Sequence, residues 1–102
     1  MTKRIAKELV LKKWEWIVKH GHTYRMKPIS EMEFELLRAV PALLDIRSGC
    51  GYCEKYGGCH ECPIPPLDSG FDCWDMKSVY RIWLYKRTKK NAQAMLDLVR
   101  KT

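Results

Sequence analysis

Five cysteines lie in one short stretch of the sequence. They are Cys50, Cys53, Cys59, Cys62 and Cys73, and no cysteine occurs elsewhere in the 102 residues. The first two form a Cys-x-x-Cys pair and the next two form a second pair. A spacing of two residues lets both thiolates face one ion while backbone amides of the turn donate to the sulfurs, and tetrahedral Zn²⁺ is the common outcome. The cluster therefore predicts a bound zinc ion.

The ligand set stays open at this point. Cys73 could replace Cys59, and His60 could also ligate, because the gap between the pairs is shorter than the roughly 15 to 20 residues of a usual zinc ribbon. An iron–sulfur cluster, disulfides and free thiols are the other uses of such cysteines. The odd number of cysteines and an N-terminal segment without the apolar run of an export signal argue against a disulfide framework.

The sequence offers little that resembles catalytic machinery. A zinc ion held by four sulfurs has no open position for water or substrate. Reactive dithiols usually open a helix beside a strand, and no strand–helix unit is evident around the cysteines. A glycine-rich phosphate loop, a serine elbow and a His-Glu-x-x-His helix are all absent from the sequence. We therefore expect a protein that is not an enzyme and has no small-molecule substrate.

Helical periodicity predicts the elements on either side of the cysteines. Residues 3–20 form an amphipathic helix with Gly21 as its C-terminal cap, and 21–27 form a loop. The apolar arc of the helix over 3–20 is wide enough to need two neighbouring elements or a partner to cover it. The arc contains Ile5, Ala6, Leu9, Val10, Trp14 and Ile17, with Leu11, Val18 and Trp16 at its edges.

A second helix is predicted to begin at Ser30. Glu33 follows at the spacing of a capping box, and Ile29 with Phe34 occupies the positions of a hydrophobic staple. We expect Pro41 to kink this helix or to begin a short following one over 42–47.

The apolar period returns from Met76 to Val99. It is interrupted over 88–91, so the pattern allows one long helix or two shorter ones. Strand is expected only as a small hairpin near the cysteines.

These elements predict a mainly α fold in one domain spanning residues 1–102. Three to four helices over 3–47 and 75–100 would form the scaffold, and 48–74 would form the cysteine-rich metal loop. No stretch has the roughly 20 apolar residues that span a bilayer. We therefore expect a cytoplasmic protein that does not bind membranes.

Charge is segregated along the chain. The formal net charge is +7, and both ends are basic while residues 28–75 are acidic. This pattern invites an anionic partner, either nucleic acid (DNA or RNA) or an acidic protein surface. Basic helices lying beside an acidic loop would explain it equally well.

In the last helical segment, four-residue spacing predicts a phosphate-contacting face of Lys77, Arg81, Tyr85, Lys86, Lys89 and Lys90.

The alternative partner is a protein. Four tryptophans in so short a chain suggest surplus aromatic surface, for which Trp16, Trp74 and Tyr56 are the candidates. The chain would then be a zinc-stabilised adaptor or inhibitor without nucleic-acid binding.

Residues 48–100 contain, in order, two Cys-x-x-Cys turns, Pro63 directly after the second turn, Cys73 and a basic final helix. This order resembles that of short uncharacterised proteins encoded by phages, which contain similar cysteine clusters. The resemblance implies a cytoplasmic regulator and no particular activity.

Overall fold

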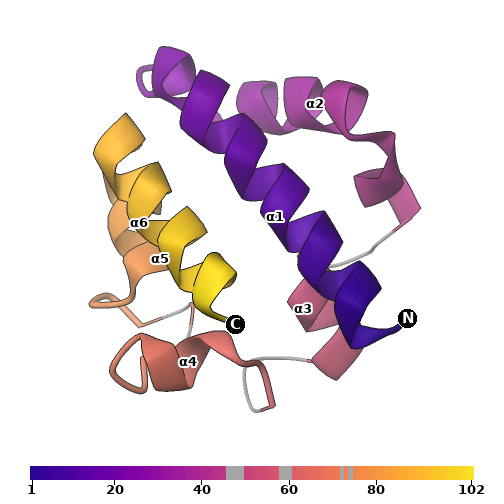
Figure 1. Cartoon of the computed structure of the whole chain (residues 1–102). Helices are drawn as coiled ribbons and strands as arrows, with labels where there is room; N and C mark the ends of the chain where they lie inside the picture. The colour runs from indigo at the N-terminus through magenta and orange to yellow at the C-terminus, as the bar shows by residue number, and fades with distance from the viewer. Residues whose placement is uncertain (46–49, 58–60, 72, 74) are drawn as a thin grey trace.

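The computed structural model of this chain describes residues 1–45, 50–57, 61–71, 73 and 75–102. These residues form helices and turns, so the predicted mainly α fold is confirmed (Figure 1). The expected hairpin near the cysteines is not found in the described part of the chain, where the cysteine-rich segment instead carries two short helices, α3 (Gly51–Tyr56) and α4 (Ile64–Leu67). Among the described residues, no helix is long and apolar enough to cross a membrane.

Helix α1 (Lys3–His20) has the bounds that its periodicity predicts. The Thr2 hydroxyl caps its first turn by accepting from the Ile5 amide at 3.1 Å. The helix runs through the middle of the molecule with α6 on one side and α2 on the other (Figure 1), so its wide apolar arc has the neighbours it requires. Ile5 is an exception, because it lies 47% exposed near the helix start.

The segment after α1 is not the expected loop. Gly21–Tyr24 form a 3₁₀ helix, η1, and Gly21 has a right-handed φ of −60°. Glycine is favoured there by close packing, because a Cβ atom would lie 2.9 Å from Ile17 Cγ2.

Helix α2 (Ile29–Ala39) begins one residue before the predicted cap. Its N-cap is Pro28, whose ring fixes φ near the helical value, so Ser30 lies inside the first turn and does not cap it. Phe34 is 63% exposed, and the predicted staple is therefore wrong. The short helix expected after the proline is confirmed as η2 (Pro41–Asp45), whereas the predicted end at residues 46–47 lies outside the described residues.

The last segment forms two helices, α5 (Val79–Tyr85) and α6 (Lys89–Lys101). Ser78 and Thr88 cap them, each hydroxyl accepting from the amide three residues on. The polar interruption in the pattern therefore marks a real break. Met76 precedes α5 and is 69% exposed, so its expected place in the helix is wrong.

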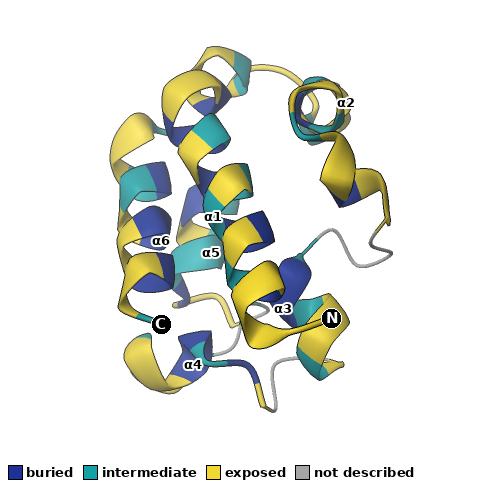
Figure 2. Cartoon of the chain, turned by 45° about the vertical axis from the view of Figure 1, so that its right-hand side comes forward, coloured by how far each residue is buried: buried dark blue, intermediate teal, exposed yellow. Residues whose placement is uncertain are grey.

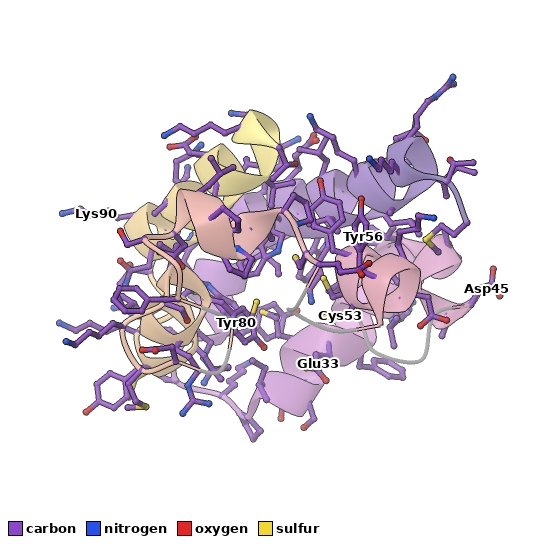
Figure 3. All side chains as sticks on the ribbon, turned by 90° about the horizontal axis from the view of Figure 1, so that it is seen from below. Glu33, Asp45, Cys53, Tyr56, Tyr80 and Lys90 are labelled. Carbon is purple, nitrogen blue, oxygen red and sulfur yellow. The ribbon has the colours of Figure 1, made fainter. Side chains whose placement is uncertain are left out.

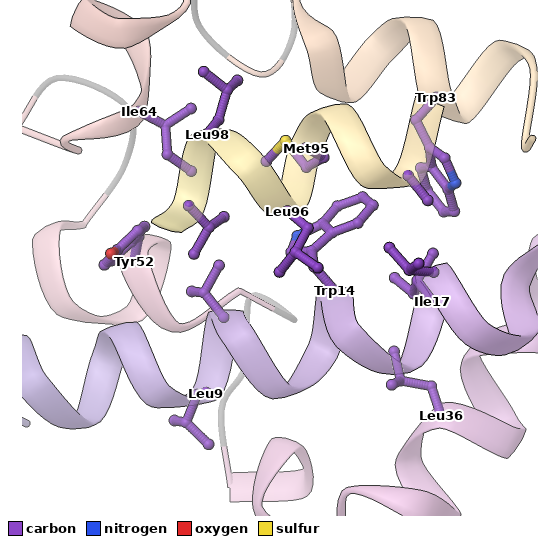
Figure 4. Close-up of a cluster of buried hydrophobic side chains, with 14 of the residues drawn as sticks. Leu9, Trp14, Ile17, Leu36, Tyr52, Ile64, Trp83, Met95, Leu96 and Leu98 are labelled. Carbon is purple, nitrogen blue, oxygen red and sulfur yellow. The ribbon is translucent and has the colours of Figure 1, made fainter. Parts of the chain in front are cut away.

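The core lies between α1, α5 and α6 and contains two of the tryptophans. The rings of Trp14 and Trp83 meet edge to face with centroids 4.9 Å apart, and Tyr80 contacts both. Figures 2 and 4 show the buried faces of α1 and α6 turned toward each other, with Met95 and Leu96 beside Trp14. Trp16 lies half-buried against His20 and Tyr24, and Trp74 is outside the described residues.

Candidate functional site

The first cysteine pair lies on α3, which packs unusually close to α1. A Cβ atom on Gly51 would lie only 2.6 Å from the Ala6 carbonyl oxygen and 3.2 Å from Leu9 Cβ. The glycine is therefore needed for close approach to α1. A left-handed backbone occurs at Gly57, whose φ is 72° and which caps the end of α3.

Cys50 and Cys53 form a thiol pair at the start of α3. The pKa of Cys50 is lowered from 9.0 to about 6, mainly by a hydrogen bond from the Cys53 side chain and against the opposing effect of burial. The Lys13 ammonium and the backbone amides of Cys53 and Tyr52 contribute to the same lowering. Cys50 is therefore a thiolate at neutral pH, which is the form that binds metal.

The other two described cysteines, Cys62 and Cys73, each affect the pKa of a tyrosine; Tyr52 is buried and Tyr80 is half-buried. Burial raises the pKa of Tyr52, and the charges of Cys62 and Cys50 add to this rise. Burial also raises the pKa of Tyr80, with contributions from Cys73, Glu33 and Cys50.

Cys50 therefore acts electrostatically on both tyrosines, while Cys62 acts on Tyr52 and Cys73 acts on Tyr80.

The thiol pair suits a zinc ion in its chemistry. It provides two adjacent sulfurs, amides that donate to one of them, and Lys13 to balance their negative charge. Among the residues the structure describes, however, no three His, Cys, Asp or Glu side chains are grouped closely enough to hold a metal. Cys59 and His60 lie outside the described residues. The described structure therefore pairs two predicted ligands, Cys50 and Cys53, and does not group Cys62 or Cys73 with both of them.

The predicted phosphate-contacting face does not form one continuous row. Its spacing assumed a single helix, but Lys77 precedes α5, Lys86 ends α5, and Lys89 and Lys90 begin α6. Arg81 is half-buried, and its Nη2 donates to Met76 Sδ at 3.4 Å. Four predicted residues nevertheless remain exposed around the turn between α5 and α6: Tyr85, Lys86, Lys89 and Lys90.

Arg87 joins this turn to a second basic segment that sequence reasoning missed. Its Nη2 donates to the Lys27 carbonyl at 2.7 Å and to the Arg25 carbonyl at 3.4 Å. Figure 1 shows the same proximity, with η1 lying beside the start of α6. Both Arg25 and Lys27 are exposed. No periodicity signals this contact, because Arg87 bonds to backbone atoms about sixty residues away.

We call the resulting region the basic end. It consists of exposed residues from the two joined segments, and Tyr85 is its most exposed aromatic side chain at 88%. Lys90 points outward from the body of the molecule in Figure 3. The members of the basic end are Arg25, Lys27, Tyr85, Lys86, Lys89 and Lys90.

Comparison with known proteins gives no further guide to these sites. The chain matches no family model, no curated protein and no solved structure. The functional argument therefore rests on the residues and their arrangement.

Proposed function

We propose that this protein is a small zinc-stabilised module that binds nucleic acid through the basic end. The observation that carries the proposal is the Arg87 contact, which joins two separate basic segments into one exposed surface. Lysine and arginine side chains there supply affinity for phosphates by releasing counterions. The exposed Tyr85 ring offers a face on which a base can stack.

In this proposal zinc has a structural role. Cys50 and Cys53 hold the ion, and the remaining ligands come from Cys59, Cys62, Cys73 and His60. When bound, zinc cross-links the cysteine-rich segment, which has few apolar side chains of its own to bury. A closed site of this kind supports no catalysis, in keeping with a regulatory module that is not an enzyme.

Nucleic-acid binding can be tested by fluorescence anisotropy at two salt concentrations. The test variant replaces Lys86, Lys89 and Lys90 with Gln. A matched control replaces three other exposed lysines, Lys12, Lys19 and Lys55, and so changes net charge equally.

We expect the test variant to bind more weakly. The slope of the logarithm of its binding constant against the logarithm of the salt concentration should become less steep by about 0.7 to 0.9 per lost phosphate contact. Equal effects of both variants would assign the affinity to net charge alone. No binding by the unaltered protein to DNA or RNA at about 50 mM salt would refute the proposal.

Zinc can be tested by elemental analysis of protein purified under reducing conditions. We expect about one zinc ion per chain, and its loss in the double variant Cys50→Ser, Cys53→Ser. A folded, metal-free protein with all five thiols titratable would contradict the zinc proposal.

A protein partner is the second candidate, and the outer face of α5 favours it. Ile82 is 46% exposed on that helix, and Met76, whose sulfur accepts from Arg81 of the same helix, is 69% exposed. Exposed apolar side chains are common at protein interfaces. A pull-down with the unaltered protein, repeated with Ile82→Asp, would detect such a partner and show whether it docks on α5.

A further inference from the structure

A groove of about 430 Å³ lies far from the basic end, where the first turns of α1 meet α3 and the end of α6. Figure 1 shows these parts of the chain together at the lower edge of the molecule. The groove combines basic and aromatic side chains with little acid. Its lining includes Lys3, Arg4, Lys7, Glu8, Tyr52 and Tyr56.

One wall of the groove is positively charged. It carries Lys3, Arg4 and Lys7 on the first turns of α1, and the first turn of this helix contains no acidic residue. The amides of a helix N-terminus add partial positive charge. Glu8 is the acidic residue of the lining, and it pairs with Arg4 at 3.4 Å, which leaves two lysines to meet an anion.

The other wall presents a tyrosine ring held in place from behind. Tyr56 is half-buried, and its ring lies 6.1 Å from that of Tyr52. Tyr52 is only 2% exposed, and its hydroxyl is hydrogen-bonded to the Thr102 side chain. The Tyr56 ring is therefore braced by a buried neighbour and needs little ordering to stack against a ligand.

We propose that this groove binds one nucleotide of a single-stranded nucleic acid, with the base against Tyr56 and the phosphate near Lys3 and Lys7. The inference rests on the proposed function and adds the class of ligand. A duplex keeps its bases stacked on each other, so it cannot offer a base face to Tyr56, whereas a single strand can. The groove lies along the first half of α1, and the basic end lies beyond the last turn of this helix, which is about 27 Å long, so one strand can contact both.

The test uses a fluorescent single-stranded oligodeoxyuridylate of about 12 nucleotides, within the range of known single-strand sites. Binding is measured for the unaltered protein, Tyr56→Leu, Tyr56→Phe and Lys7→Gln, with circular dichroism to confirm folding. We expect Tyr56→Leu to weaken binding about 5- to 150-fold, the range reported for losing one stacked base. Tyr56→Phe keeps the ring and should remain within about twofold, and Lys7→Gln should flatten the salt dependence.

A second measurement avoids mutation. The same oligonucleotide carrying 5-iodouracil is irradiated with the unaltered protein, and the cross-linked residue is identified by mass spectrometry. A cross-link at Tyr56 is the expected result.

The outcomes separate this inference from the proposed function. A cross-link only at Tyr85, with Tyr56→Leu binding normally, would overturn the groove and leave the basic end standing. Duplex binding as tight as single-strand binding would overturn the single-strand assignment. No binding to either probe would overturn both proposals.

Discussion

Replacing Gly51 with alanine should destabilise the protein, although the same change usually stabilises a helix. Gly51 is the first residue of α3 and lies against the backbone of α1. An added Cβ would lie 2.6 Å from the Ala6 carbonyl oxygen and 3.2 Å from both Leu9 Cβ and Val10 Cγ2. A backbone carbonyl inside a helix cannot turn aside as a flexible side chain can, so α3 must move away from α1.

The size of the effect follows from two opposing contributions. Overpacking of this kind costs about 1 to 3 kcal/mol. Replacing glycine with alanine at a position whose backbone alanine can adopt contributes about 0.4 to 1 kcal/mol in the opposite direction. We therefore expect the free energy of unfolding to fall by about 1 to 2 kcal/mol, which lowers Tm by about 5 to 15 °C in a domain of this size.

Urea unfolding followed by tryptophan fluorescence measures this change, because Trp14 and Trp83 are both buried in the core. Lys55→Ala is the matched control, since Lys55 is an exposed residue of the same helix and its replacement should stay within about 0.5 kcal/mol. If Gly51→Ala leaves stability unchanged or raises it, the close approach of α3 to α1 is wrong.

Two further predictions concern a helix cap and a thiol. Ser78→Ala should lower the free energy of unfolding by about 0.5 to 2 kcal/mol, because its hydroxyl accepts from the Arg81 amide at 3.1 Å and donates to the Cys73 carbonyl at 3.3 Å. Ser30→Ala should stay within about 0.5 kcal/mol, and equal losses in urea unfolding would contradict the assignment of the caps. In metal-free reduced protein, the rate of Cys50 alkylation should rise with a midpoint near pH 6, and a midpoint near 9.0 would contradict the lowered pKa. Because folding lowers this pKa, the thiolate's contribution to stability is complete above pH 9.0 and is lost as the pH falls through about 6.

Local patterns in the sequence predicted the long helices well. The bounds of α1 and the break before α6 follow from the spacing of apolar residues and from the polar interruption near Thr88, and both depend on near neighbours along the chain. The start of α2 was predicted less well, because two local signals competed there. Pro28 fixes a backbone angle whatever surrounds it, whereas the Ser30 cap requires a backbone conformation that the earlier start excludes.

The cysteine spacing by itself brings two thiols together, because a separation of two residues acts within a single turn. It could not predict that α3 would rest against α1 through Gly51, or that Lys13 would stand close enough to Cys50 to lower its pKa. Those features depend on how two helices pack against each other. The same Cys-x-x-Cys motif is compatible with several different packing arrangements, so the motif alone does not determine them.

The candidate binding surfaces show the same division. The sequence determined that both ends of the chain are basic, and it placed Tyr85 among lysines. Only the tertiary structure decided that residues 25–27 would lie beside the turn between α5 and α6. Arg87 makes that contact by donating to two backbone carbonyls, and every residue has a carbonyl, so no side-chain pattern can reveal which ones are chosen.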